Sequence, residues 1–322
     1  MRVLVTGGAG YIGSVVAARL VADGVDVVVV DDLSTGHSDA VPPGVTLHRR
    51  SVADLGGVLG DWGVDAVIHF AAKSLVGESA RDPGLYWHNN VAGTLALLDA
   101  MRVHGVGRIV FSSSAATYGE VAEQPIREEA STRPASPYGA SKLAVDLALA
   151  DYAGAYGLGA VSLRYFNVAG ALHEPGGRSY GERHATETHL IPNALGAVAG
   201  TRPPLTLFGT DYPTPDGTCI RDYVHVVDLA DAHVRALGLA ERGDHHIVNL
   251  GSGRGYSVRE VLGTVGEVAG REVPHVVAGR RAGDPPELVA AIDRAGELLG
   301  WYPQRDLRLM VEDAARFHAV RR

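Results

Sequence analysis

The glycine-rich segment near the start of the chain constrains the fold more than any other feature. Residues 7–13 read Gly-Gly-Ala-Gly-Tyr-Ile-Gly and lie between an apolar run at 3–6 and a helical pattern at 11–22. This is the spacing of the dinucleotide fingerprint, which requires a strand before it and a helix after it. Glycines let the backbone approach a pyrophosphate, and the helix N-terminus offers it unpaired amides. The segment therefore predicts a Rossmann-type nucleotide-binding fold.

A single acidic residue indicates which dinucleotide binds. Asp31 ends the second predicted strand, 18 residues after Gly13. A carboxylate at this point can accept hydrogen bonds from the adenosine ribose, and it repels a 2'-phosphate. The sequence therefore favours NAD over NADP.

A tyrosine, a lysine and a serine form the predicted catalytic group. Tyr138 and Lys142 are four residues apart and share one face of a predicted helix. A neighbouring ammonium favours the phenolate form of tyrosine, so we expect Tyr138 to take a proton near neutral pH. Ser114, the last residue of a run of three serines, can hold the same substrate oxygen by a hydrogen bond, and Lys142 can also reach the nicotinamide ribose. This chemistry is alcohol oxidation with hydride transfer to NAD.

Hydrophobic periodicity gives the fold class. Apolar runs alternate with amphipathic helical patterns in the first half of the chain, as in a parallel sheet with helices on both faces. The predicted strands cover residues 3–6, 27–31, 45–49, 66–70, 109–112 and 160–165, and predicted helices cover 11–22 and 91–103. From about Arg164 the order breaks, and a Gly-, Pro- and His-rich loop follows at 170–184.

We expect an α/β protein with a Rossmann-type doubly wound parallel sheet and a smaller C-terminal α/β domain. The NAD-binding domain is predicted over residues 1–165, with a return segment over 224–250 that reads as strand, helix and strand. The substrate domain is predicted over 166–322.

Composition and charge limit the classes of partner that the protein can bind. The 322 residues are 46% apolar, enough for a sizeable core, and the net charge is −8 with scattered Lys and Arg, which excludes nucleic acid as a partner. Cys219 is the only cysteine, so no intramolecular disulfide can form. No apolar run reaches membrane-spanning length, and no charged leader precedes the first strand. We therefore expect a cytoplasmic protein without membrane partners.

Motifs along nearly the whole chain resemble the UDP-hexose 4-epimerases of the extended short-chain dehydrogenase/reductase superfamily. Besides the features above, the resemblance rests on His-Phe-Ala-Ala at 69–72, Val-Gly-Glu-Ser at 76–79, Asn-Asn-Val-Ala-Gly-Thr at 89–94, Arg-Tyr-Phe-Asn at 164–167, Phe-Gly-Thr-Asp-Tyr at 208–212, Gly-Thr-Cys-Ile-Arg-Asp-Tyr-Val-His-Val at 217–226, Asn-Leu-Gly at 249–251 and Arg-Arg-Ala-Gly-Asp at 280–284.

The resemblance implies an isomerase that interconverts UDP-glucose and UDP-galactose. A tightly held NAD oxidises C4 of the UDP-hexose, the keto sugar turns over, and the hydride returns to its opposite face. It also implies a homodimer, in which segments around 91–103 and 142–156 pair across a twofold axis, although core packing explains their amphipathic pattern equally well.

The resemblance also implies two sets of binding residues. For NAD these are Gly7, Gly10, Tyr11, Ile12, Gly13, Asp31, Asp32, Ser51, Val52, Phe70, Ala71, Ala72, Asn89, Ser112, Tyr138, Lys142 and Tyr165. For the UDP-sugar they are Ser114, Tyr138, Phe166, Asn167, His189, Leu190, Thr206, Phe208, Arg221, Tyr223, Arg281, Asp284 and Leu288. Arg221 and Arg281 suit the two phosphates because a guanidinium is permanently charged and can chelate oxygens.

Some positions depart from the pattern of this family. Ser51 stands where an aspartate often faces the adenine amine, Ser74 where a lysine often lies near the cofactor, and His189 where an asparagine lies near the uridine diphosphate. Leu288 aligns with a tyrosine of members restricted to unsubstituted sugars. We therefore expect some room for N-acetylhexosamines.

Other functions are alternatives to epimerisation. A nucleotide-sugar 4,6-dehydratase needs an acidic pair after its catalytic Ser or Thr, but Ala115 and Ala116 follow Ser114, so elimination lacks its general acid. A UDP-glucuronate decarboxylase or epimerase also begins by oxidising C4 and stays open. A non-catalytic dinucleotide sensor is a further alternative, against which the intact catalytic group argues.

Histidine spacing does not predict a metal site. The chain has 14 histidines, and His184, Glu187 and His189 fall in a predicted loop rather than in the helical metalloprotease motif. The other close pair, His245 and His246, precedes a predicted strand. We therefore predict no catalytic metal.

Overall fold

The computed structural model describes residues 1–281 and 283–320. Ala282, in the last of the motifs above, and residues 321–322 of the predicted substrate domain lie outside the described residues. Among the described helices, none combines the length and the apolar character needed to span a bilayer.

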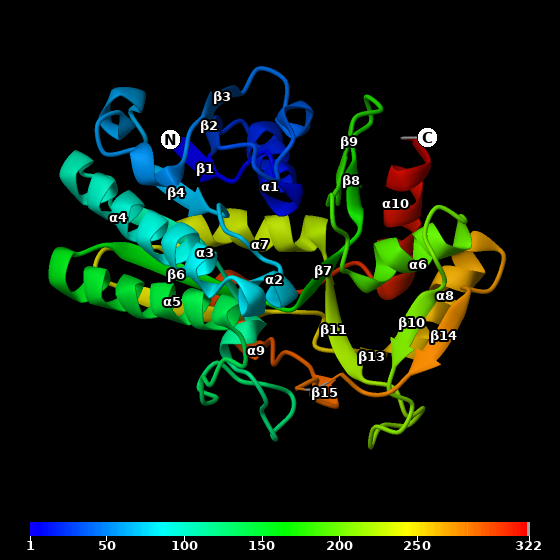
Figure 1. Ribbon diagram of the computed structural model, residues 1–322. Helices are drawn as coiled ribbons and strands as arrows, with labels where there is room; N and C mark the ends of the chain where they lie inside the picture. The colour runs from blue at the N-terminus through cyan, green and yellow to red at the C-terminus, as the bar shows by residue number, and fades with distance from the viewer. Residues whose placement is uncertain (282, 321–322) are drawn as a thin grey trace.

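A parallel sheet of seven strands organises the larger part of the described chain (Figure 1). Its strands, in spatial order, are β12 (His245–Leu250), β6 (Gly159–Tyr165), β5 (Arg108–Ser114), β4 (Ala66–His69), β1 (Arg2–Thr6), β2 (Asp26–Asp31) and β3 (Thr46–Arg49). All neighbouring pairs are parallel. The predicted fold class is therefore confirmed, and the strands from β1 to β6 lie within a few residues of their predicted bounds.

Helices cover both faces of this sheet because its strand residues alternate between two cores. Val3 and Val5 of β1 face the core formed with α1 (Tyr11–Ala22) and α7 (Val226–Leu239), whereas Leu4 faces the core formed with α4 (Gly93–His104) and α5 (Pro137–Tyr156). Figure 1 shows these two helix pairs on opposite faces. Both faces are buried, which is why the strands read as nearly continuous runs of Val and Ile.

The strand order reverses between β1 and β4, since the chain runs outward from β1 to β3 and then crosses to β4. Ligands of open α/β sheets bind at the carboxyl ends of the strands at such a switch point. The helical stretch that follows β4 comprises α2 (Val76–Arg81), α3 (Pro83–Tyr86) and a π-helical turn (Trp87–Ala92) that leads directly into α4. The predicted helix at 91–103 therefore begins earlier in the structure, within continuous helical backbone.

The smaller part of the molecule stands beside the carboxyl edge of the large sheet, on the right of Figure 1. Strand β11 (Ile220–His225) pairs with β7 (Asn167–Ala169), β13 (Gly255–Ser257) and β15 (Glu287–Leu288). Strands β10 (Leu205–Phe208) and β14 (His275–Ala278) form a parallel pair. The helices here are α6 (Leu190–Val198), α8 (Val258–Ala269) and α10 (Leu307–Val320), while α9 (Asp293–Leu299) packs with α7.

Two expectations need correction. The segment 170–184, predicted as a loop, contains the antiparallel hairpin of β8 (Ala171–His173) and β9 (Ser179–Gly181). The return segment begins with α7 rather than at residue 224, because β11 belongs to the smaller sheet and only α7 and β12 return to the larger one. An apolar strand has the same sequence pattern in either sheet, so the sequence could not show which sheet β11 joins.

Candidate functional site

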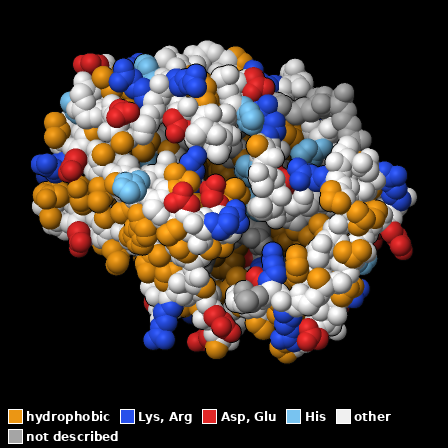
Figure 2. Space-filling view, in the orientation of Figure 1, with side chains coloured by type: hydrophobic (Ala, Val, Ile, Leu, Met, Phe, Trp, Pro, Cys, Tyr) orange, Lys and Arg blue, Asp and Glu red, His pale blue; other side chains and the backbone are white. Residues whose placement is uncertain are grey.

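The carboxyl ends of the parallel strands open into a cavity of about 610 Å³, which we call the strand-end cavity. It lies where the surface is hollowed between the two parts of the molecule (Figure 2). The predicted NAD residues that line it are Gly7, Gly10, Tyr11, Ile12, Asp31, Asp32, Ser51, Val52, Phe70, Ala71, Ala72, Asn89, Ser112, Tyr138, Lys142 and Tyr165. Of that predicted set, Gly13 alone does not line the cavity.

The glycine loop is held by close backbone contacts. Gly7 has φ +69°, and a side chain there would put its Cβ 2.6 Å from the Ala71 nitrogen. A Cβ at Gly13 would overlap the Gly7 carbonyl oxygen, so Gly13 acts by letting α1 start against the loop. Gly10 is the N-cap of α1 and carries no side chain to cap the first amides. These amides are available to an anionic ligand such as a pyrophosphate.

Asp31 ends β2 at the rim of the strand-end cavity. Its carboxylate accepts hydrogen bonds from the Ala9 nitrogen at 3.0 Å and the Leu33 nitrogen at 2.8 Å. Burial raises the pKa of Asp31, and these two backbone hydrogen bonds oppose the rise. The carboxylate is thus fixed in orientation beside the glycine loop, as recognition of a ribose requires.

The catalytic residues converge from β5 and α5. Tyr138 lies in the first turn of α5, which Ser136 caps by accepting a hydrogen bond from the Gly139 nitrogen. Tyr138 and Ser114 share a hydrogen bond. Lys142 donates from Nζ to the Ser112 carbonyl at 2.7 Å, and its Nζ lies 6.0 Å from the centroid of the Tyr138 ring.

Burial controls the electrostatics of this group. Burial raises the pKa of Tyr138, and the hydrogen bond with Ser114 only partly offsets the rise. Burial also lowers the pKa of Lys142 to about 7, against the opposing charge of Asp146. Desolvation by the protein therefore penalises both charged forms, the phenolate of Tyr138 and the ammonium of Lys142.

A second cavity of about 460 Å³, which we call the outer cavity, adjoins the first in the smaller part of the molecule. Asn167, His189 and Arg221 line both cavities. The other predicted UDP-sugar residues divide between them: Ser114, Tyr138, Phe166, Asp284 and Leu288 line the strand-end cavity, and Leu190, Thr206, Phe208, Tyr223 and Arg281 line the outer one.

Two arginines flank Asp284 where the cavities meet. Arg281 donates from Nε to Asp284 at 2.8 Å, and Arg221 lies 3.7 Å from the same carboxylate. Arg221 also donates to the carbonyls of Ile220 and Pro285, which fixes its guanidinium. The Arg281 guanidinium lies 5.0 Å from the centroid of the Phe208 ring. Two cations share one carboxylate, so the group keeps positive charge for an anionic ligand.

Sequence reasoning missed Lys73. Its side chain lines the strand-end cavity, and its Nζ donates to Ser34 at 3.0 Å. It directly precedes Ser74, which departs from the family pattern and also lines this cavity. The chain thus has a cation in this cavity one residue before position 74, and the lysine beside Ser74 was the signal available in the sequence.

Comparison with known proteins agrees with this geometry. Residues 3–251 match the NAD dependent epimerase/dehydratase family. The chain belongs to this family. A UDP-glucose 4-epimerase of Corynebacterium glutamicum is 53% identical over 98% of this chain and 95% of its own length.

Two solved structures are also similar. The UDP-glucose 4-epimerase of Brucella ovis in complex with NAD is 47% identical, with a TM-score of 0.93 over 98% of each chain. The enzyme of Stenotrophomonas maltophila, with bound NAD and formylated UDP-arabinopyranose, is 39% identical, with a TM-score of 0.94 over 100% of this chain and 98% of its own. The resemblance inferred from the motifs is thereby confirmed.

Gly13→Ala should weaken NAD binding by at least about 10-fold, because the added Cβ displaces α1 from the glycine loop and misaligns its amides. Calorimetric titration with NAD, after removal of any bound cofactor, measures the change. Gly263→Ala in α8 is the control, since nothing lies within 4 Å of its added Cβ. NAD affinity in Gly13→Ala equal to that of the unaltered protein would contradict the role given to this contact.

Proposed function

We propose that this protein interconverts UDP-glucose and UDP-galactose by oxidising and then reducing C4 of the sugar, with NAD as the resident cofactor. The observation that carries the proposal is that Tyr138 and Ser114 line the same cavity as the glycine loop, and that this cavity adjoins the arginine-flanked outer one. NAD supplies a hydride acceptor, and its oxidised nicotinamide carries a positive charge.

The residues of the chain handle the proton and the orientation. In the first half-reaction the Tyr138 oxygen takes the proton of the C4 hydroxyl while the C4 hydride leaves, and in the second half the proton returns. Ser114 holds the same oxygen by a hydrogen bond. Lys142, anchored on the Ser112 carbonyl, is placed to donate to the cofactor ribose. A bound nicotinamide, being positively charged, would favour the phenolate and so oppose the rise that burial causes in the pKa of Tyr138.

Epimerisation also requires that the keto sugar turn while the nucleotide stays bound. Arg221 and Arg281 are the proposed diphosphate ligands, with Asn167, Leu190 and Phe208 around the nucleotide. Around the sugar we assign Ala115, Ala116 and Leu288, which offer few polar contacts that would fix one orientation. This division assigns NAD to residues 1–165 together with the return segment, and the UDP-sugar to residues 166–322. The cytoplasmic location stays a prediction.

Tyr138→Phe should lower kcat by on the order of 10²–10⁴-fold and leave NAD bound, because it removes only the group that exchanges the C4 proton. A coupled assay of UDP-galactose turnover and the absorbance of bound cofactor are the measurements. Tyr302→Phe, at an exposed tyrosine, is the control. Full activity in Tyr138→Phe would rule out the assigned proton transfer.

Parallel incubation with UDP-glucuronate separates the alternative functions. Release of carbon dioxide identifies a decarboxylase, and no turnover of any UDP-sugar identifies a sensor.

Acceptance of N-acetylhexosamines is a further part of the proposal. Leu288 lines the strand-end cavity from β15 and leaves space that a tyrosine would fill. Leu288→Tyr should lower turnover of UDP-N-acetylglucosamine by about 10-fold or more, with UDP-galactose turnover retained as the internal control. The test is a product analysis of both substrates with both proteins. If the unaltered, active enzyme does not turn over UDP-N-acetylglucosamine, this part of the proposal is wrong.

We also propose a homodimer through α4 and α5. These neighbouring helices leave large apolar side chains exposed, with 67% of Val103, 61% of Leu147 and 56% of Tyr156 accessible. Figure 2 shows hydrophobic side chains gathered over these helices. Such a patch on a folded protein is typical of an interaction surface.

Light scattering should give twice the chain mass. Leu147→Glu should shift the protein to monomer, whereas the control Leu309→Glu on α10 should not. A monomeric unaltered protein would contradict the assignment.

A further inference from the structure

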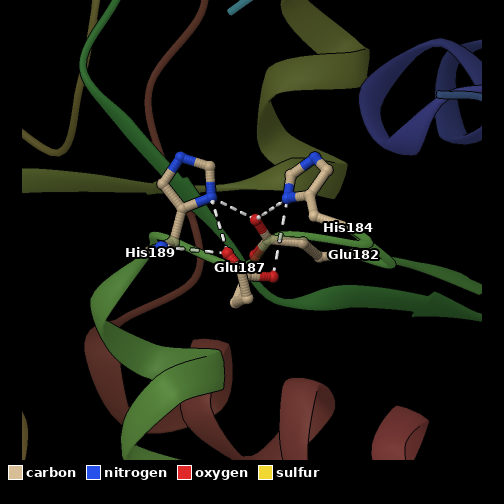
Figure 3. A group of neighbouring side chains, drawn as sticks. All are labelled: Glu182, His184, Glu187 and His189. Atoms are coloured by element: carbon tan, nitrogen blue, oxygen red, sulfur yellow. Dashed lines mark hydrogen bonds and ion pairs between the residues drawn. The ribbon is translucent and has the colours of Figure 1, made fainter. Parts of the chain in front are cut away.

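Four side chains from one short segment converge on a single point. Residues 182–189, which connect β9 to α6, read Glu-Arg-His-Ala-Thr-Glu-Thr-His. Glu182, His184, Glu187 and His189 each present one donor atom, and these four atoms all lie within 4.8 Å of one another (Figure 3). Arg183 instead pairs with Asp39 at 2.8 Å.

The distances within this cluster suit coordination of a metal ion. His184 Nδ1 lies 3.0 Å from Glu182 Oε1 and 3.5 Å from Glu187 Oε2, and His189 Nδ1 contacts Glu182 Oε1. In a tetrahedral zinc site with ligand bonds of about 2.0–2.2 Å, neighbouring ligand atoms are about 3.3–3.6 Å apart. The cluster approaches this arrangement.

The cluster also holds buried negative charge that a cation can balance. The side chains of Glu182 and Glu187 are only 7% and 3% exposed, so two carboxylates share a buried site. His184 Nδ1 is shielded from solvent and has no hydrogen-bond partner, because its contacts with both carboxylates are close but lack hydrogen-bond geometry. A cation between the four atoms would satisfy this nitrogen and both carboxylates.

Backbone contacts hold one of the proposed ligands ready. Glu187 Oε1 accepts hydrogen bonds from the Thr188 nitrogen at 2.8 Å and the His189 nitrogen at 2.9 Å. These bonds fix the carboxylate and leave Oε2 directed at His184. Supporting hydrogen bonds of this kind orient the ligands in metal sites.

We propose that Glu182, His184, Glu187 and His189 bind one divalent transition-metal ion of the zinc type in a closed, four-ligand site. Two imidazoles and two carboxylates suit Zn²⁺, and four protein ligands are typical of structural rather than catalytic sites. The ion ties the β8–β9 hairpin to the start of α6. Its role is to hold His189 and Leu190, which line the cavities assigned to the UDP-sugar.

Metal binding can be tested on the full chain without any activity assay. The purified protein is stripped with a chelator, exchanged into clean buffer and titrated with zinc sulfate, with the bound metal counted by mass spectrometry. We expect one zinc ion per chain and a rise in Tm with added zinc, since an ion that binds only the folded state stabilises it. Protein that takes up no zinc would overturn the proposal.

A variant pair locates the site. Glu187→Gln removes a charged ligand at nearly constant volume and should weaken zinc binding by at least about 10-fold and abolish the zinc-dependent rise in Tm. His275→Ala removes an exposed histidine of β14, outside the cluster, and should leave both unchanged. Equal zinc binding in Glu187→Gln and the unaltered protein would show an adventitious surface ion and overturn the proposal.

A spectroscopic measurement covers the case in which Glu187→Gln does not fold. X-ray absorption on the zinc-loaded, unaltered protein should give four nitrogen and oxygen ligands at about 2.0–2.2 Å, two of them imidazoles. A six-coordinate ion surrounded mainly by water would overturn the proposal.

Discussion

The close approach of the glycine loop to its neighbours is the constraint on which the rest of the site depends. Gly7 packs against the backbone after β4 with no room for a Cβ, and Gly13 lets α1 start against the carbonyl of Gly7. The ends of β1 and β4 and the first amides of α1 are thereby brought together at the point where the strand order reverses. Because all strands of this sheet are parallel, Asp31 and Ser112 reach the same edge as the loop. The cofactor cavity thus results from the strand order and from the absence of a side chain at Gly7 and at Gly13.

Burial dominates the electrostatics of the catalytic group. It raises the pKa of Tyr138 and lowers that of Lys142 to about 7, so the protein's own groups disfavour both charged forms. Asp146 lies one turn beyond Lys142 on α5 and opposes the effect on the lysine, while it forms a buried ion pair with Arg164 at 2.9 Å. This pair also ties α5 to β6, which sets the position of Tyr138 relative to β5. The charge state needed for proton transfer therefore depends on what occupies the cavity, and the scaffold alone does not impose it.

Features with a local physical cause could be predicted from the sequence, and features that depend on chain path could not. Helix α1 has its predicted bounds because the glycine motif and the apolar spacing agree. The β8–β9 hairpin was not predicted because each strand has only three residues, too few to show an alternating pattern. The UDP-sugar residues came from family resemblance, since no spacing rule connects Asn167 in β7 with Arg281, which are more than a hundred residues apart. Lys73 was not predicted because its place in the cavity, beside Ser34, depends on the chain path.

Of the four cluster residues, His184, Glu187 and His189 predict no metal site from the sequence, because they fall in a loop and not in the helical metalloprotease motif. The ligands of the cluster converge only because the chain turns between β9 and α6. Without an ion, contacts with Glu182 and Glu187 raise the pKa of His184 to about 9. Burial opposes protonation of His189, but hydrogen bonds to the same carboxylates prevail and raise its pKa to about 10. Two protonated imidazoles balance two carboxylates, and one divalent ion with two neutral imidazoles balances them equally. Metal and protons therefore compete for the same buried negative charge. An ion can contact all four donor atoms at once, whereas Nδ1 of His184 forms ion pairs with the two carboxylates without hydrogen-bond geometry.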